Sequence, residues 1–383
     1  MNIKILQSIA DITASEWNTL FDTSNPFIQH VFLLALEQSG CTQPSTGWEP
    51  QHLVVYQDND IVAALPNFLK THSYGEYVFD WAWANAYQQN GLSYYPKLVS
   101  AIPYTPSTGP RIGFGKDTNT QEKRLIIKRI SQTLGDQFSH ADLSSWHLLF
   151  PEHALSTLLQ QAHWKQRVGL QYHWYNDQYA SFDDFLSTFK SRKRKTLRKE
   201  RQAIIDQGIT MERVQGNDIS KELMTQFYRF YHLTYLKRSG QHGYLNLKFF
   251  LILLDTMSEN LVMMCAKKNQ ALVGAALCFK DEKTLYGRYW GCEQEYEFLH
   301  FETCYYQGIE YCIRHRLDRF DPGAQGEHKI SRGFKPTKTF SNHLILHPDF
   351  RRAIHHFIDE EEIQINAHLT HLNTLLPFKS ESS

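Results

Sequence analysis

The residues with the clearest chemical potential lie between positions 319 and 343, in the string RFDPGAQGEHKISRGFKPTKTFSNH. This segment combines turn-forming glycines and prolines with aspartate, glutamate, histidine, lysine and arginine side chains. Such groups hold anions and move protons, and loops that carry them on a rigid scaffold are common sites of binding and catalysis. The composition therefore predicts a functional loop in this segment, suited to anion binding and acid–base chemistry.

A second cluster, KSRKRKTLRKER at 190–201, holds eight of the chain's 40 lysines and arginines against one glutamate. On a helix, Arg194, Arg198 and Arg201 share one face. A ridge of this kind suits the phosphates of a pyrophosphate, a nucleotide or a tRNA backbone. The alternative is an exposed charged face without a ligand, since runs of charge are often only that.

The composition limits the framework that can position these clusters. A chain of 383 residues with 42% apolar residues is expected to fold into two domains. Acidic and basic residues number 40 each, so a polyanion must be held by a local cluster. Six cysteines without a CxxC pair indicate buried thiols in a reducing compartment. No run approaches ~18 apolar residues and no signal-peptide pattern is present, so we expect a cytoplasmic protein without a membrane span.

A weak internal repeat predicts how the elements are arranged. Strand-like segments at 52–56, 61–70 and 74–83 resemble those at 261–267, 271–280 and 284–291. Three landmark pairs lie 210, 212 and 211 residues apart: Asn59 with Asn269, Tyr74 with Tyr286, and Tyr94 with Tyr305. This spacing favours two copies of one α/β unit, although common hairpin chemistry can also produce it.

The predicted fold class is α/β, with two lobes that each contain a mixed, mostly antiparallel sheet flanked by helices. We place the first domain at 1–170, including helical connectors at 123–138 and 152–164. The second domain, 171–383, contains the basic helix at 190–201, the loop at 319–343 and a C-terminal helix at 350–376. We further expect the basic helix and the loop to face one cleft.

Several strings closely resemble the Fem-like branch of the GNAT (acyl-CoA N-acyltransferase) superfamily, often described as peptidoglycan biosynthesis or recognition proteins. Among them are PYTPSTGPRIG, WHLLFPEH, QYHWYN, FKSRKRKTLRKER and FDPGAQGEHKISRGFKP. The resemblance implies two GNAT-like lobes and N-acyl transfer to an amine or peptide acceptor. It implies acyl-CoA or aminoacyl-tRNA as a co-substrate, with no tightly bound cofactor. The Gln/Arg-x-x-Gly-x-Gly/Ala loop of ordinary GNAT proteins is missing, which argues against acetyl-CoA, and the basic helix is a candidate replacement for that cradle.

Amide formation from an activated ester needs a base for the acceptor ammonium and donors for the tetrahedral oxyanion. The candidate bases lie near the third strand of the second lobe and after its next strand: His300, Glu302, Asp321, Glu327 and His328. The candidate donor-binding residues lie in the basic helix and the loop: Arg192, Lys193, Arg194, Lys195, Arg198, Lys199, Gly323, Gly326, Lys329 and Arg332. The equivalent loop of the first lobe, 103–111, lacks acids and imidazoles, so we interpret that lobe as a supporting or acceptor-binding half.

Two other kinds of function stay open at this point. His300, Glu302, Glu327 and His328 are candidate metal ligands, although their spacing matches no known ligand motif. A duplicated fold that recognises a peptide, glycan or tRNA without chemistry is the main rival, because the sequence shows no activated nucleophile. The residue pattern selects neither the acceptor amine nor the oligomeric state.

Overall fold

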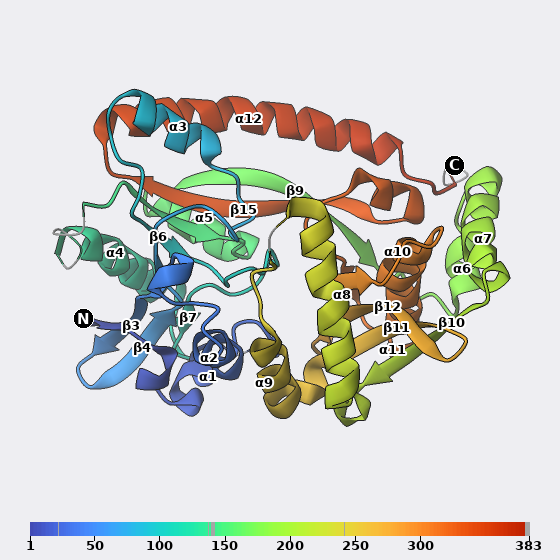
Figure 1. The fold of residues 1–383 in the computed structure, drawn as a ribbon. Helices are drawn as coiled ribbons and strands as arrows, with labels where there is room; N and C mark the ends of the chain where they lie inside the picture. Colours follow the sequence, from blue (N-terminus) through green and yellow to red (C-terminus); the bar gives the residue numbers. More distant parts are fainter. Residues whose placement is uncertain (22, 137, 139–141, 241, 380–383) are drawn as a thin grey trace. The chain divides into compact units, whose positions relative to one another are not determined.

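The computed structural model describes residues 1–21, 23–136, 138, 142–240 and 242–379 (Figure 1). Contacts divide the chain into one unit of residues 1–170 and 338–367 and another of residues 171–337 and 368–383. We predicted a single division after residue 170; in the structure, residues 338–367 belong instead to the first unit. Both units combine mostly antiparallel strands with flanking helices, so the predicted α/β class is confirmed.

Three elements have residues in both units. They are β9 (Lys165–Tyr175), β15 (Lys335–Ile345) and α12 (Pro348–Thr374). The last of these is the helix predicted at 350–376. Each unit is therefore built from two separate stretches of the sequence, and neither is a continuous segment.

The first unit contains two runs of paired strands. One has the order β1-β3-β4-β7, formed by β1 (Asn2–Leu6), β3 (His52–Gln57), β4 (Asp60–Leu65) and β7 (Gly113–Phe114). The other has the order β15-β8-β6-β5-β2, formed with β8 (Ser145–Leu149), β6 (Lys97–Ser100), β5 (Phe68–Lys70) and β2 (Trp48–Pro50). Only the β6–β8 pair of these two runs is parallel. Leu53, Leu98 and Trp146 share one buried apolar cluster, so both runs contribute to this unit's core.

The helices of the first unit agree with the sequence in part. They are α1 (Ala14–Phe21), α2 (His30–Gln38), α3 (Trp81–Gln89), α4 (Thr120–Asp136) and α5 (His153–Gln161). The predicted connectors at 123–138 and 152–164 correspond to α4 and α5; residue 137 lies outside the described residues. The strand predicted at 61–70 divides into β4 and β5, because Pro66 between them has no N–H for a ladder.

The strand predicted at 74–83 is wrong. This stretch is a loop that leads into α3, so Tyr74 lies outside regular structure. Tyr94, which follows α3, also lies in a loop, whereas Tyr286 lies in a strand and Tyr305 in a helical turn. A buried ion cluster explains the loop, since the Lys97 Nζ lies 2.9 Å from a Glu76 carboxylate oxygen and also contacts Asp80. Of the repeat landmarks, only Asn59 and Asn269 occupy matching places, the turns of the β3–β4 and β11–β12 hairpins.

The strands of the second unit pair in the order β10-β11-β12-β13-β14-β9. Their bounds are β10 (Ile209–Gln215), β11 (Leu261–Lys268), β12 (Ala271–Lys280), β13 (Thr284–Cys292) and β14 (Arg319–Asp321). β11, β12 and β13 are the three strands predicted in this half. β13 and β14 are parallel and pair only at 284–286 with 319–321, so among the described residues the second half of β13 extends beyond that pairing.

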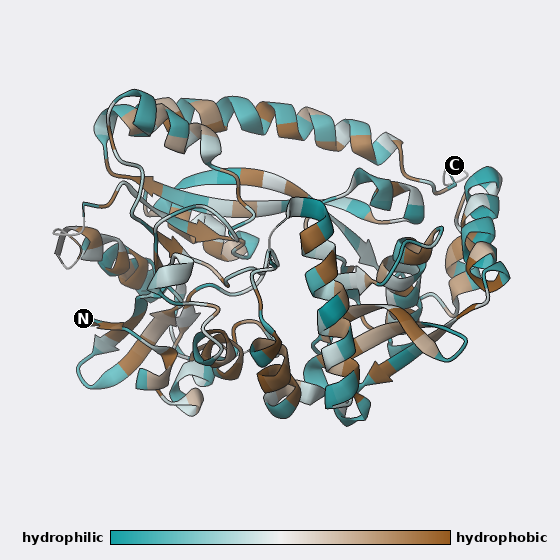
Figure 2. Ribbon diagram, viewed as in Figure 1, coloured by the Kyte–Doolittle hydropathy of each residue, from teal (hydrophilic) through white to brown (hydrophobic). Residues whose placement is uncertain are grey.

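The second unit's helices begin with α6 (Phe182–Ser187) and α7 (Ser191–Asp206), followed by α8 (Lys221–Ser239) and α9 (Leu247–Met257). α10 (Leu299–Phe301), a π-helical turn (Glu302–Tyr306) and α11 (Gln307–His315) follow one another without a break. Figure 2 shows α9 as largely hydrophobic and the first turns of α7 as hydrophilic, as the predicted basic helix requires. None of the helices in the described ranges has the length and apolar character needed to cross a bilayer.

Candidate active site in the second unit

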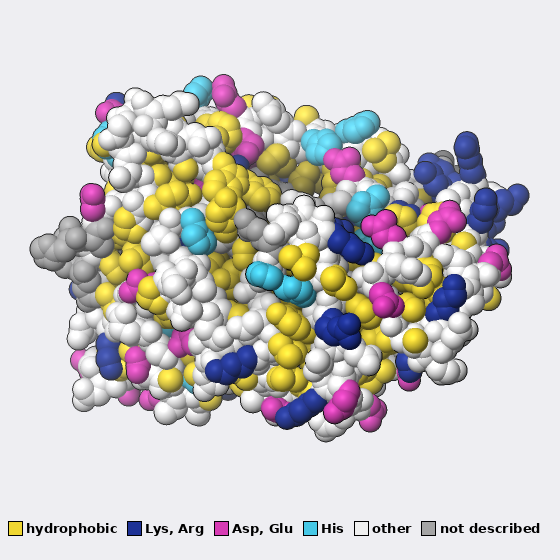
Figure 3. All heavy atoms as spheres, in the orientation of Figure 1, with side chains coloured by type: hydrophobic (Ala, Val, Ile, Leu, Met, Phe, Trp, Pro, Cys, Tyr) yellow, Lys and Arg dark blue, Asp and Glu magenta, His cyan; other side chains and the backbone are white. Residues whose placement is uncertain are grey.

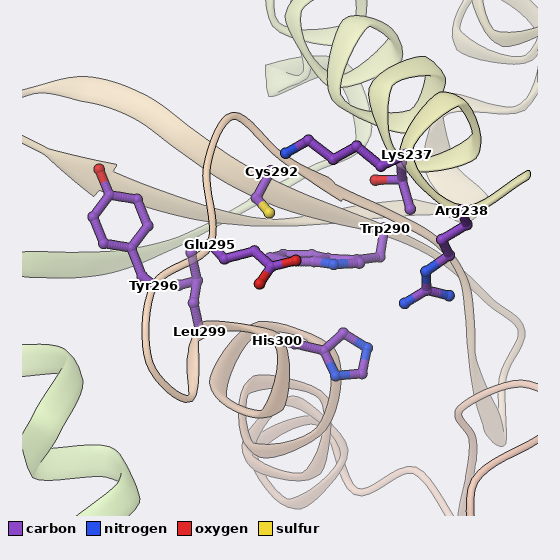
Figure 4. Close-up of a pocket in the computed structure, with 9 residues that line it drawn as sticks. Lys237, Arg238, Trp290, Cys292, Glu295, Tyr296, Leu299 and His300 are labelled. Atoms are coloured by element: carbon purple, nitrogen blue, oxygen red, sulfur yellow. The ribbon is translucent and has the colours of Figure 1, made fainter. Parts of the chain in front are cut away.

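A pocket of about 220 Å³ lies where β13 ends and α10 begins (Figure 4). One wall comes from the C-terminal turns of α8, and the others come from β13, the loop after it and the start of α10. The residues that line it are Thr234, Lys237, Arg238, Trp290, Cys292, Glu295, Tyr296, Leu299 and His300. Of the candidate bases, only His300 lines this pocket.

His300 is partly buried among aromatic rings. Its imidazole lies edge-on to Trp290, with ring centroids 5.7 Å apart, and edge-on to Tyr305 at 5.2 Å. Burial, together with the nearby His328 and Arg238, lowers the pKa of His300 to about 3. His300 is therefore neutral at physiological pH and offers one N–H donor and one lone pair.

His328 lies beside this group and forms the second imidazole of the site. Its Nε2 is 2.9 Å from the hydroxyl of Tyr305, and its ring centroid is 6.3 Å from that of His300. Burial lowers the pKa of His328 below its usual value, and Arg332 and Lys329 add to this effect. The structure thus brings together two of the predicted bases, His300 and His328, with Tyr305 between them.

Gly326 makes room for the His328 ring. Its backbone has φ of +113°, and a Cβ at this position would lie 2.5 Å from the His328 Cε1 atom. Any other residue at 326 would have to displace the imidazole as well as adopt a strained backbone. Gly323 also has a positive φ, of +96°, but its N–H donates to the Asp321 carboxylate at 3.0 Å. That amide is therefore occupied within the loop.

Glu302 and Asp321 are held in ion pairs, which argues against the base role that we predicted for them. Glu302 is buried and accepts hydrogen bonds from Arg201 at 2.9 and 3.1 Å. Asp321 is buried and lies 2.7 Å from the Arg288 guanidinium. Burial alone would raise the pKa of Asp321, but Arg288 and His173 hold it well below its usual range. Both carboxylates brace the helices and strands around the site.

The other polar residues of the loop also have internal partners. The Lys329 ammonium is buried and donates to the Gly323 carbonyl at 2.7 Å, and burial lowers the pKa of Lys329 to about 8. Arg332 is paired with Glu200 at 2.9 Å and stacks on Phe301 at 3.4 Å. Both were predicted to hold the donor; in the structure Lys329 bonds within the loop, and Arg332 links the loop to α7 and α10.

Glu327 is the remaining candidate base, and it is exposed. Its carboxylate lies 3.3 Å from His368 of α12. The four candidate metal ligands therefore have different partners. Across the residues that the structure describes, no three or more histidine, cysteine, aspartate or glutamate side chains are grouped to hold a metal ion.

The basic helix is divided between a packed and an exposed side. Leu197, Glu200 and Ile204 of α7 are buried, while Arg192, Lys193, Lys195 and the neighbouring cations project outward. Figure 3 shows these cations as a dense blue cluster over α7. None of the six predicted donor-binding residues of this helix lines the pocket, and neither does any residue of 319–343. The structure therefore gives no support to a single cleft that both segments face.

Most of the residues that line the pocket were not predicted from the sequence. Lys237 and Arg238 lie at the end of α8, more than fifty residues before Trp290, and nothing in the sequence links the two segments. Glu295 and Tyr296 stand in CEQEYE, an acidic stretch between a strand and a helix, which was the one available signal. Tyr305 was named only as a repeat landmark, because residues five apart do not share a face of a regular α-helix, and the π-helical turn at Glu302–Tyr306 was not predicted.

Comparisons with known proteins agree with this architecture. A family model described as FemAB-like, peptidoglycan biosynthesis/recognition, matches residues 8–380. A crystal structure of FemX is similar with a TM-score of 0.54 and 12% identity, covering 93% of this chain and 100% of that chain. A conserved protein of unknown function from Bacteroides thetaiotaomicron is similar with a TM-score of 0.52 and 11% identity, covering 90% of this chain and 100% of that one. No curated protein sequence matches the chain. Because the family model spans nearly its whole length, the chain belongs to the FemAB-like family.

Proposed function

We propose that this protein is an N-acyltransferase that moves an acyl or aminoacyl group from an activated, phosphate-bearing donor to an amine. The observation that carries the proposal is the pairing of His328 with Tyr305 beside the pocket that His300 lines. Amide formation needs a base and an oxyanion donor held close together, and this group supplies both types. The family's description points to a peptidoglycan-related acceptor.

His328 is the better base of the two histidines. An ammonium with a pKa of about 8 would lose its proton to His300, whose pKa is about 3, only at a cost of about 7 kcal/mol. His328 is exposed, whereas His300 is only partly exposed, so an entering substrate reaches His328 more readily. We assign proton removal to His328 and a hydrogen-bonding role to neutral His300.

Tyr305 supplies the complementary group. Burial raises the pKa of Tyr305 well above its usual range, so its hydroxyl stays protonated and can donate a hydrogen bond. In the proposed step, the His328 Nε2–H donates to the Tyr305 oxygen, which leaves the Tyr305 O–H for the developing oxyanion and the Nδ1 lone pair of His328 as the base. The acceptor nitrogen attacks the acyl carbonyl and loses its proton to Nδ1. Collapse of the tetrahedral intermediate breaks the bond to the donor's alcohol or thiol, which leaves with the proton that His328 took up.

The exposed cations of α7 fit a phosphate-bearing donor. The first turn of this helix contains Arg192, Lys193 and Arg194 and no acidic residue. Cations at a helix N-terminus are unfavourable by about 0.3–1 kcal/mol each, and a bound polyanion removes that penalty. The pocket itself has mixed charge, because Glu295 lines it together with Lys237 and Arg238, so it offers a pyrophosphate no purely cationic cradle. This charge distribution favours aminoacyl-tRNA over acyl-CoA as the donor.

A transfer assay with aminoacyl-tRNA and with acyl-CoA, using a peptidoglycan-precursor peptide as acceptor, tests the proposal. We expect His328→Ala to lower kcat by about 10²–10⁴-fold while the melting temperature stays close to that of the native protein. His356→Ala, at an exposed position of α12, is the matched control and should leave the rate unchanged. Undiminished transfer by the His328 variant would overturn the assignment of the base.

Salt dependence separates donor binding from chemistry. Removing Lys193, Lys195 and Lys199 should lower the slope of log K against log salt for tRNA by about 2, at about 0.7–0.9 per phosphate contact. Removing three cations of α4, Lys123, Arg124 and Lys128, should leave the slope unchanged. If tRNA and acyl-CoA both bind without any transfer, the protein is a binding module of the same fold. This is the second candidate function because both acids of the loop already have partners, Asp321 with Arg288 and Glu327 with His368.

A further inference from the structure

The pocket described above has opposite charges on its walls. Lys237 and Arg238 enter from the end of α8, and Glu295 enters from the loop after β13. Figure 4 shows Glu295, Arg238 and His300 arranged around the ring of Trp290. A cavity that needed only to hold a phosphate would not carry a carboxylate, and one that needed only to hold an amine would not carry two cations.

These charges do not neutralise one another. Neither Arg238 nor Glu295 forms a salt bridge with any residue that the structure describes, and Lys237 donates only to the Glu293 carbonyl, at 3.3 Å. The charged groups that shape the rest of the site behave differently, because Arg201, Arg288 and Arg332 all have carboxylate partners. The pocket charges are thus available to a ligand.

The aromatic floor adds a second feature suited to a cation. Trp290 is held in place by close packing, since a Cβ on Gly274 of β12 would lie only 3.1 Å from its ring. An ammonium over an indole face gains attraction from the ring electrons, and a nearby carboxylate strengthens it. His300, which is neutral, adds a hydrogen-bonding group without adding charge.

The size of the pocket limits the ligand. A volume of about 220 Å³ lies below the ~300–1,000 Å³ typical of pockets for drug-sized molecules. A nucleotide would exceed it, whereas a single amino-acid unit has the right scale. The walls are also charged, so a plain hydrocarbon acyl chain is a poor match.

We infer that this pocket binds a zwitterionic amino-acid unit, with its ammonium between Glu295 and the Trp290 face and its carboxylate on Arg238. The inference rests on the proposed N-acyl transfer and names its acceptor class: an amine acceptor that carries a free α-amino-acid end. A side-chain amine of that unit, lying beyond the pocket toward His328, is the group to be acylated. The zwitterion itself is recognised and is not consumed.

Isothermal calorimetry on the full chain, without any donor, tests the inference. The probes are L-lysine, Nα-acetyl-L-lysine, L-lysine methyl ester and cadaverine. The acetylated probe lacks the α-ammonium, the ester lacks the carboxylate charge, and cadaverine lacks the whole carboxylate group while keeping two ammonium groups. We expect L-lysine to bind at least tenfold more tightly than each of the other three. Equal affinity for the acetylated probe would mean a simple anion site, equal affinity for cadaverine a simple cation site, and no binding of L-lysine would overturn the inference outright.

Variants then locate the binding. Glu295→Gln and Arg238→Gln should each weaken L-lysine at least tenfold, whereas Glu297→Gln, in the same loop but outside the lining, should change nothing. Glu295→Gln should leave the already weak Nα-acetyl-L-lysine unaffected, which a general loss of structure would not do. These experiments distinguish failure of the N-acyltransferase proposal from failure of the pocket assignment. Binding of L-lysine without any acyl transfer contradicts the transferase proposal alone. Acyl transfer by a protein that does not bind L-lysine contradicts the pocket assignment alone.

Discussion

Replacement of Glu200 tests what holds the loop at 327–332 against the basic helix. The Glu200 carboxylate accepts from the Arg332 guanidinium at 2.9 and 3.0 Å, and the same arginine donates to the Tyr306 hydroxyl at 3.1 Å and to the His328 carbonyl at 2.9 Å. The side chains of Arg332 and Glu200 are only 6% and 10% exposed. Removing the carboxylate therefore leaves the Arg332 guanidinium buried without its anionic partner, and little water can reach the charge to solvate it.

We expect Glu200→Ala to lower the free energy of unfolding by about 3–5 kcal/mol, the cost of breaking a buried ion pair. Glu200→Gln keeps the shape and one acceptor, so it should cost less than Glu200→Ala. The double variant Glu200→Leu/Arg332→Met should recover much of the loss, because it removes both charges together. Urea unfolding followed by far-ultraviolet circular dichroism measures all three. The single variants Glu200→Leu and Arg332→Met complete the cycle. If the double variant loses as much free energy of unfolding as these two single variants together, the two side chains are not coupled and the reasoning is wrong.

The remaining predictions concern acid stability, the glycine beneath His328 and thiol reactivity. The depressed pKa of Asp321 means that its ion pair contributes its full stability above the ordinary aspartate range of about 4 and loses it progressively as pH falls below that range; the cost of Asp321→Asn should therefore be largest at pH 7 and shrink steadily below pH 4, as pH-dependent urea unfolding will show. Gly326→Ala should lower the transfer rate at least about 100-fold by moving the His328 ring, whereas Gly208→Ala, with a similar positive φ but open space around it, should affect stability alone. Cys292 lines the pocket and should be the first cysteine to react with a thiol reagent at pH 8, and L-lysine should slow that reaction; a rate indifferent to L-lysine would contradict the inferred binding.

Regular local patterns explain what could be predicted from the sequence. The strands of the second unit alternate or run apolar between short turns, and α7 follows its charge periodicity, so local chemistry was sufficient for these elements. The segment 74–83 was predicted as a strand because it is rich in aromatic residues. Its conformation depends instead on the buried contact of Asp80 with Lys97, which forms only in the folded protein. Among the described residues the cysteines form no disulfide; Cys41, Cys265, Cys278 and Cys312 are buried as predicted, whereas Cys292 and Cys304 are partly exposed.

The site was predictable only in part, for a physical reason. His300 and His328 could be named as candidates because imidazole is the side chain whose ordinary pKa best suits proton transfer near neutral pH. Glu302 and Asp321 could not be separated from true bases, because the arginines that bind them, Arg201 and Arg288, come from distant segments. An acid's role depends on its partners, and the partners are set by the fold.

The interleaved division of the chain has a consequence for synthesis on the ribosome. β8 pairs with residues 341–345 of β15, yet the 167 residues from 171 to 337 are translated between the first unit's main segment and that strand. Translation of these residues at about 5–20 residues per second takes about 8–33 s, and during this time one edge of β8 has no partner strand. The second unit's main segment emerges complete during that interval, so it can fold before the unit that precedes it. Ribosome-bound intermediates should accordingly expose β8 to chaperones until the last fifty residues have been made.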